Sequence, residues 1–138
     1  MNMNALGRHI IVEYYNCNED ILKDPDLISE YMQTAAVKSK ATIVESVFHH
    51  FNPWGVSGAV IISESHLAIH TWPEFGFAAV DLFTCGDIDP WKGFDYLEQV
   101  FEAQRSESIE MPRGMTEKIR KYYPADLGEI VYKQETAV

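Results

Sequence analysis

The chain has 138 residues and a formal net charge of −10 at pH 7, from 11 Lys and Arg against 21 Asp and Glu. This length fits a single domain, spanning residues 1–138, with one hydrophobic core. The acidic balance argues against nucleic acid and anionic membranes as partners, because few positive charges are available to meet their phosphates. It mildly favours a cationic substrate or product.

Signals for export or membrane insertion are not evident. No segment approaches the roughly 20 apolar residues of a membrane-spanning helix, and the first residues do not combine a basic region with an apolar run. We therefore expect a cytoplasmic protein. A chain with an adequate core has little need of a disulfide in that compartment, so Cys17 and Cys85 are expected to be free thiols.

The hydrophobic pattern changes between the period of strands and the period of helices. β-branched and aromatic runs bounded by Gly, Pro and Asn indicate strands. Two segments have apolar residues at helical spacing, and each begins with Asp followed by Pro, which are typical of a helix N-cap and first helical residue. In chain order we expect a strand at 8–15, a helix from 24–26, strands at 41–51, 57–63, 67–72 and 77–84, a helix from Asp89 and Pro90, and a short strand near Ile109, followed from about Gly114 by a polar, weakly patterned tail.

The connections between the central strands are too short for crossover helices, so these strands are expected to be antiparallel neighbours. The two helices each have one apolar face and cover the same sheet. The predicted fold class is α+β, a two-layer α/β sandwich with an antiparallel sheet and two main helices on one face. Residues 59–62 are apolar on both faces, which implies that the second face is buried too. We expect a homodimer that packs sheet against sheet into four layers, αββα.

Residues 55–86 combine a Glu-Ser-His triplet, a second His, a Trp-Pro-Glu and a Cys within a strand-rich segment. Core strands seldom carry such a mixture, because a buried polar group without a partner costs about 1–3 kcal/mol. The segment therefore indicates a functional site. Taken singly, its members say less, since an isolated His70 is more often structural and an isolated Cys85 is more often an inert buried thiol.

Two familiar kinds of site fit this segment poorly. His66 and His70 lie on a segment that alternates as a strand, so they would be about 13 Å apart. One zinc ion with bond lengths near 2.1 Å cannot join them, and we expect no metal. A Ser65–His70–Asp81 triad is conceivable, but Ser65 lacks the Gly-x-Ser-x-Gly setting of a nucleophile elbow.

The motifs taken together resemble the prokaryotic S-adenosylmethionine decarboxylase proenzymes, a pyruvoyl-dependent family. The resemblance covers about residues 5–114. Its central motifs are Ser57, Glu64-Ser65-His66, His70-Thr71-Trp72-Pro73-Glu74 and Asp81-Leu82-Phe83-Thr84-Cys85-Gly86. Further matching segments are Leu6-Gly7-Arg8-His9, residues 41–44, Phe48-His49, Phe51, Pro53, residues 55–58, Asp89-Pro90-Trp91 and Arg113-Gly114.

The resemblance implies that the chain cuts itself between Glu64 and Ser65. Ser65 would attack the Glu64 carbonyl to form an ester, and loss of the Ser65 α-proton would eliminate the Glu64 carboxylate. The resulting dehydroalanine hydrolyses to a pyruvoyl group and ammonia, leaving a β chain of residues 1–64 and an α chain of residues 65–138. The resemblance assigns His70 as the base for the α-proton, with Ser57 assisting, and an imidazole is a suitable proton acceptor near neutral pH.

The resemblance also implies the roles of four residues in the mature enzyme. The pyruvoyl group made from Ser65 would form a Schiff base with the substrate amine and accept electrons as carbon dioxide leaves. Cys85 would then donate a proton to the former α-carbon. Glu74 would bind the ribose hydroxyls, and Phe51 would supply an aromatic face near the adenine or the sulfonium. A solvated turn carboxylate and a core aromatic residue are the ordinary interpretations of these last two.

The implied activity is decarboxylation of S-adenosylmethionine to S-adenosylmethioninamine, the aminopropyl donor for spermidine biosynthesis. A pyruvoyl-dependent decarboxylase of another amino acid, such as ornithine or arginine, would have the same processing residues. A third hypothesis is a non-catalytic relative that keeps the fold as a binding subunit of a dimer. The presence of Ser65, His70 and Cys85 argues against it, and an uncut chain on denaturing electrophoresis would favour it.

Overall fold

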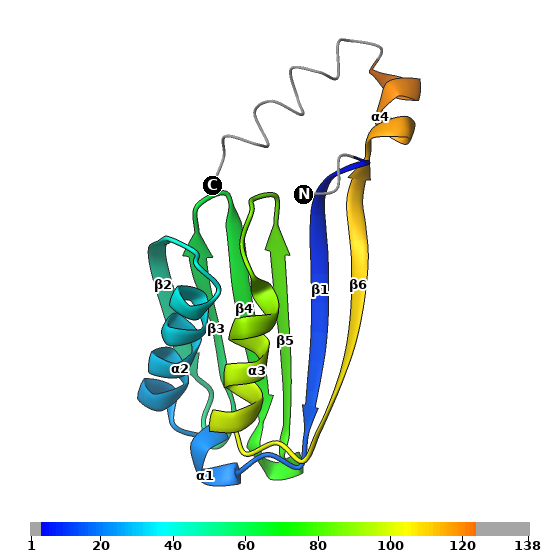
Figure 1. Ribbon diagram of the computed structural model, residues 1–138. Coiled ribbons are helices and arrows are strands. Elements are labelled where there is room, and N and C mark those ends of the chain that lie inside the picture. The colour runs from blue at the N-terminus through cyan, green and yellow to red at the C-terminus, as the bar shows by residue number, and fades with distance from the viewer. Residues whose placement is uncertain (1–3, 124–138) are drawn as a thin grey trace.

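The protein folds around one antiparallel sheet with the strand order β2-β3-β4-β5-β1-β6 (Figure 1). The structure is a computed structural model that describes residues 4–123. Its elements are β1 (Ala5–Tyr15), α1 (Glu19–Leu22), α2 (Pro25–Lys38), β2 (Ile43–His50), β3 (Val56–Ile62), β4 (Ser65–Trp72), the 3₁₀ helix η1 (Pro73–Phe75), β5 (Phe77–Thr84), α3 (Pro90–Val100), β6 (Arg105–Met115) and α4 (Thr116–Tyr122).

Helices α2 and α3 lie side by side on one face of the sheet, as Figure 1 shows. Met32 of α2 and Leu97 of α3 are fully buried against apolar strand residues such as Val60 and Ile69. Burying a side chain of this size contributes about 1.5–3 kcal/mol, so this layer contains the hydrophobic core of the described chain. The predicted α+β sandwich with two main helices on one face is confirmed.

The starts of these two helices are set by different contacts. Asp24 caps α2 as predicted, since its Oδ1 accepts hydrogen bonds from the backbone of Asp26 and Leu27, both at 3.1 Å. Asp89 stands at the N-cap position of α3, but its side chain makes no capping bond there. Its backbone N–H instead donates to the carbonyl of Ser39 at 2.9 Å, so contact with the end of α2 fixes where α3 begins.

The C-terminal part differs most from the predicted elements. Strand β6 has 11 residues, where the sequence predicted only a short strand near Ile109, and α1 and α4 were not predicted at all. β6 is an edge strand that is exposed along nearly its whole length, so it lacks the apolar alternation that reveals a half-buried strand. Its Pro112 is tolerated because an edge strand leaves one side unpaired. The rest of the predicted tail, residues 124–138, lies outside the described residues.

The face of the sheet opposite the helices, here called the open face, is not covered by any helix of the described chain. The alternation predicted for β4 is confirmed, because Leu67, Ile69 and Thr71 are buried under the helices while His70 and Trp72 are exposed. Exposed apolar side chains on the open face are Ile11, Val47, Ile61 and Ile109, each with 39–67% of its surface accessible. Such a surface is typical of a contact face.

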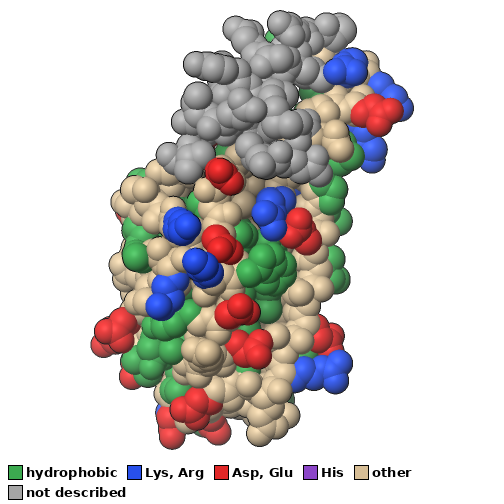
Figure 2. All heavy atoms as spheres, in the orientation of Figure 1, with side chains coloured by type: hydrophobic (Ala, Val, Ile, Leu, Met, Phe, Trp, Pro, Cys, Tyr) green, Lys and Arg blue, Asp and Glu red, His purple; other side chains and the backbone are tan. Residues whose placement is uncertain are grey.

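The helix side of the molecule carries mixed acidic and basic side chains around small apolar areas, as Figure 2 shows. None of the described histidines is visible on that side. Within residues 4–123, no helix is long and apolar enough to cross a membrane. Both cysteines are free, as predicted.

Candidate active site

The predicted cleavage point lies in the tight turn between β3 and β4. Ile62 pairs with Ser65 across the turn, which leaves Ser63 and Glu64 to reverse the chain. Glu64 has φ +56°, the left-handed conformation that an L-residue with a long side chain seldom adopts. β4 begins at Ser65 rather than at the predicted residue 67, so the Glu64–Ser65 peptide bond joins a strained turn to a regular strand.

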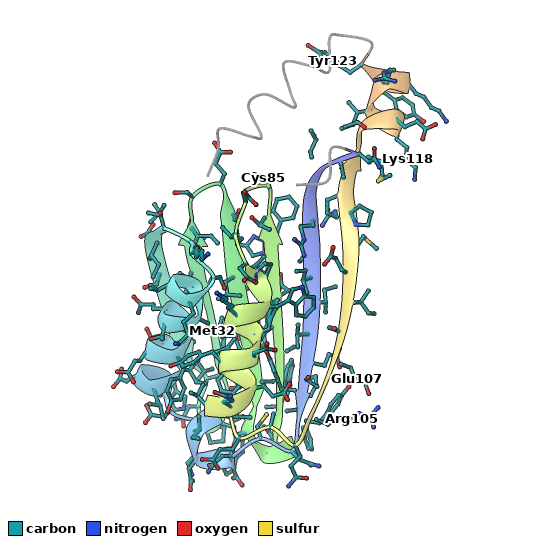
Figure 3. The ribbon with its side chains drawn as sticks, viewed as in Figure 1. Met32, Cys85, Arg105, Glu107, Lys118 and Tyr123 are labelled. Carbon is teal, nitrogen blue, oxygen red and sulfur yellow. The ribbon has the colours of Figure 1, made fainter. Side chains whose placement is uncertain are left out.

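Three groups meet at this peptide bond, and together they form what we call the junction: Glu64, Ser65 and Cys85. The Cys85 thiol donates to the backbone carbonyl of Glu64 at 3.3 Å and lies 3.7 Å from its carboxylate. The Ser65 hydroxyl is buried and has no hydrogen-bond partner among the described residues. Cys85 follows β5 and lies at the same end of the sheet as the turn (Figure 3). The Cys85 thiol polarises the Glu64 carbonyl, and the Ser65 hydroxyl beside it is unpaired within the described chain. This arrangement is suited to attack by the hydroxyl on the carbonyl.

The Cys85 thiol remains protonated at neutral pH. Partial burial raises the pKa of Cys85, and the negative charge of Glu64 and the hydrogen bond to it raise this pKa further. Each of these effects disfavours the thiolate. Cys85 is therefore an acid and a hydrogen-bond donor here, rather than a nucleophile.

The other predicted site residues gather in a hollow of about 310 Å³ between the β2–β3 loop and η1. The hydroxyl of Ser57 lies 2.7 Å from Nδ1 of His70, on paired positions of β3 and β4. Phe51 is 53% exposed, so it is not a core aromatic residue. Glu74 lies in η1 and lines the same hollow. We call this cavity, with its four predicted site residues Phe51, Ser57, His70 and Glu74, the hollow.

The junction and the hollow do not meet within one chain. Ser65 and His70 are five positions apart on the same straight strand, which places them roughly 16 Å from each other. Ser57 is hydrogen-bonded to His70 and so lies equally far from the cleavage point. The sequence placed the residues of both regions in one site, and it did not reveal that the two regions are separated within one chain.

A third polar cluster was not predicted. Asp81 Oδ2 accepts hydrogen bonds from His9 Nε2 at 2.9 Å and from His66 Nε2 at 3.1 Å. Because Asp81 bonds these histidines while His70 bonds Ser57, the Ser65–His70–Asp81 triad is not assembled. Strand alternation places His9, His66 and Asp81 on the same face of the sheet. They come together only because of the register in which β1, β5 and β4 pair.

The cluster has the ligand types of a metal site, since one ligand atom from each of His9, His66 and Asp81 lies within 4.8 Å of the others. The contact with Arg113 favours a hydrogen-bond network over a metal site. Arg113 Nη1 lies 3.0 Å from His9 Nδ1, and because a guanidinium only donates, Nδ1 accepts and Nε2 carries the proton. A metal-bound His9 would need a free lone pair on Nε2 and an acceptor at Nδ1. The cluster is thus a hydrogen-bond network.

The chain belongs to the S-adenosylmethionine decarboxylase family, whose sequence pattern matches residues 8–114. This agrees with the resemblance found in the motifs. A relative from Fervidobacterium nodosum named S-adenosylmethionine decarboxylase proenzyme is 56% identical over 118 residues, which are 85% of this chain and 86% of the relative. The protein of the same name from Thermotoga maritima is 53% identical over 118 residues, 85% of this chain and 91% of that one.

Solved structures agree in fold. The adenosylmethionine decarboxylase of Aquifex aeolicus superposes with a TM-score of 0.74 at 32% identity, covering 80% of this chain and 92% of that one. The AdoMetDC-delta26 monomer of Trypanosoma brucei superposes with a TM-score of 0.57 at 16% identity, covering 85% of this chain and 55% of that one. The second likeness shows the fold alone.

Proposed function

We propose that this chain is a proenzyme that cuts itself between Glu64 and Ser65 and then decarboxylates S-adenosylmethionine. One observation carries the proposal: the Cys85 thiol donates to the Glu64 carbonyl at 3.3 Å, directly beside the unpaired, buried hydroxyl of Ser65. The relatives named proenzymes support the self-cleavage, and their common name supports the activity.

The junction supplies the first step of the cut. The Ser65 hydroxyl attacks the Glu64 carbonyl carbon, its proton passes to the departing amide nitrogen, and an ester replaces the peptide bond. Negative charge develops on the carbonyl oxygen, where the Cys85 thiol already donates. A donor at such a position is worth about 10²–10³ in rate. Removal of the Ser65 α-proton then expels the Glu64 carboxylate and leaves dehydroalanine, which hydrolyses to a pyruvoyl group and ammonia.

The hollow supplies the base for this α-proton, and it must come from a second copy. His70 of the same chain is roughly 16 Å from Ser65, too far for proton transfer, which needs contact within about 3 Å or one bridging water. We therefore propose a homodimer packed through the open faces, in which Ser57 and His70 of one copy serve the junction of the other. The exposed apolar side chains of the open face support this packing.

The same pairing completes the decarboxylating site. The unpaired Ser65 hydroxyl fits a position that becomes a pyruvoyl group, which supplies a carbonyl that accepts electrons as carbon dioxide leaves. Cys85, kept protonated, donates a proton to the substrate carbon. Phe51 and Trp72 line the hollow and can face a sulfonium or an adenine, while Glu74 accepts hydrogen bonds from ribose hydroxyls.

S-Adenosylmethionine is favoured over ornithine or arginine as substrate. Relatives that are 56% identical over 85% of the chain are named S-adenosylmethionine decarboxylase proenzymes. The product, S-adenosylmethioninamine, donates the aminopropyl group for spermidine biosynthesis. A cytoplasmic location remains a prediction from the sequence.

Intact mass and a substrate assay test the function. The purified chain is expected to give two fragments, 1–64 and 65–138, the second with a blocked amino end. Carbon dioxide release is expected from S-adenosylmethionine and not from ornithine or arginine. A chain that stays whole and carries no carbonyl reactive toward hydrazines would contradict the proposal and favour the non-catalytic hypothesis.

Co-expression tests the shared site separately. A tagged His70→Ala chain keeps its own junction, and an untagged Ser65→Ala chain keeps its own hollow, so each is expected to remain uncut alone. Together they are expected to cut the tagged chain in mixed dimers. Absence of this cut, in mixed dimers shown to form, would place both regions in one chain's site.

A further inference from the structure

The open face carries a chain of polar side chains for which the proposed reaction has no use. Arg113 of β6 donates to His9 of β1 at 3.0 Å, and His9 donates to Asp81 of β5 at 2.9 Å. His66 of β4 donates to the same carboxylate oxygen at 3.1 Å. The chain of hydrogen bonds therefore ties four neighbouring strands together. We call these four residues the clasp.

The clasp encloses one aromatic ring. Phe83 lies 6.1 Å from the His66 ring in a stacked arrangement, and 6.0 Å from the His9 ring edge to face. The Arg113 guanidinium lies over the same ring at 5.8 Å. Gly7 makes room for it, since a Cβ there would come within 2.9 Å of the Phe83 ring. Phe83 is thus held from three sides by residues of three strands.

The position of the clasp along the strands connects it to the junction. His66 and Phe83 form the last paired positions of β4 and β5 at this end of the sheet. Ser65 directly precedes His66 and Cys85 follows two residues after Phe83, so both reactive residues lie just beyond the end of the ladder. Strand ends separate most easily, because fewer contacts hold them together. The clasp adds side-chain hydrogen bonds at this last β4–β5 pair.

We infer that Asp81 is a positioning residue for the self-cleavage: by binding His66 and His9 it holds the last β4–β5 pair closed, and so keeps the Glu64 carbonyl on the Cys85 thiol. This inference rests on the proposed function. Without the carboxylate, two imidazole N–H groups lose their acceptor, and the strand end is free to open. A small shift of a donor away from a developing oxyanion is costly in rate.

The rate of the cut tests the inference. Precursor is made by cell-free synthesis, and the appearance of fragment 65–138 with time is followed in wild type, Asp81→Ala, His66→Ala and His66→Gln. Asp81→Ala removes the shared acceptor, and both it and His66→Ala are expected to slow the cut at least about tenfold. His66→Gln keeps a donor that can reach Asp81, and is expected to stay within about threefold of wild type.

A matched control breaks an ion pair between the same strands on the opposite face of the sheet. Arg8 of β1 lies 2.8 Å from Glu110 of β6 and makes no hydrogen bond to the clasp, so Glu110→Gln is expected to cut at the wild-type rate. Normal cutting by Asp81→Ala, or equally slow cutting by both His66 variants, would overturn the inference. If Asp81→Ala does not fold, the two His66 variants decide the question.

A second readout does not depend on the cut. In the uncut Ser65→Ala background, Asp81→Ala is expected to increase the alkylation rate of Cys85 at least about threefold, because the thiol loses its carbonyl partner. The rate of the buried Cys17 serves as the internal reference. An unchanged Cys85 rate would overturn the inference. A wild-type chain that never cuts would contradict the proposed function while leaving this measurement valid.

Discussion

The junction and the hollow lie at opposite ends of the same strands and differ in burial. At the junction, the Ser65 hydroxyl is buried and unpaired and Glu64 is in a left-handed turn. In the hollow, Ser57 and His70 are hydrogen-bonded to each other and the imidazole is exposed. One region is strained and enclosed, whereas the other is relaxed and accessible. In the proposed reaction, a single chain therefore carries all the candidate groups but keeps the base too far from its own cleavage point.

The largest effect is expected from Ser65→Ala, which removes the attacking hydroxyl from the junction. The chain should stay whole and lose at least about 10³-fold of its decarboxylase activity, since no other group can replace the pyruvoyl carbonyl. Intact mass and carbon dioxide release measure both effects. Ser63→Ala, on the other side of Glu64, is the matched control and should cut normally. Activity in an uncut Ser65→Ala chain would contradict the proposed mechanism.

Cys85→Ala is expected to separate the two reactions. The cut should become slower by about 10²-fold but still occur, because the hydroxyl and the strained turn remain. Turnover by the fraction that has been cut should fall by a further factor of about 10²–10⁴, because the proton donor is missing. The cut is followed by electrophoresis and turnover by carbon dioxide release per pyruvoyl group. Full turnover after the cut would exclude Cys85 as the acid.

Glu74→Gln probes the hollow, with a smaller expected effect. The KM for S-adenosylmethionine should rise about tenfold with kcat changed less than about threefold, because the carboxylate binds substrate without taking part in the reaction. The cut should proceed at its normal rate. Glu30→Gln, on the exposed side of α2, controls for the loss of one negative charge. A change in kcat alone would place Glu74 in the chemistry instead.

The smallest effect concerns the pKa of Cys85 in the uncut Ser65→Ala chain. Burial and the Glu64 carboxylate raise this pKa, so the thiolate should form at a higher pH than in a free thiol. Glu64→Gln removes the negative charge and should shift the pH midpoint of alkylation downward, by the small amount that an exposed charge contributes. Burial raises the pKa of Cys17 to about 11, so it should not interfere.

The sequence predicted the central part of the fold because strand alternation there is strong. Leu67 and Ile69 alternate with exposed residues, and Asp24 caps its helix through local contacts. The exposed edge strand β6 could be only partly predicted, since neither of its faces requires apolar residues. For the site, residue types and motifs supplied the candidate residues. The spacing that put His66 and His70 about 13 Å apart also separates Ser65 from His70, but Ser65 was expected to lie outside a strand that began at residue 67, so this separation was missed.

The clasp shows a different limit of sequence reasoning. His9, His66 and Asp81 are far apart in the chain, and they meet only because β1, β5 and β4 are neighbours in a particular register. Periodicity places each residue on one face, but it gives no information about which strands adjoin. The contact of Arg113 with His9 could not be predicted either, because the sequence indicated only a short strand near Ile109 and β6 extends to Met115.

The left-handed conformation of Glu64 favours the proposed cut. A residue held in such a conformation stores about 1–3 kcal/mol, and each 1.4 kcal/mol corresponds to a tenfold change in an equilibrium constant. In the proposed reaction Glu64 becomes a chain end, so this strain would be relieved. The Cys85 thiol would lose its carbonyl acceptor at the same time, and its proton would become available to the substrate.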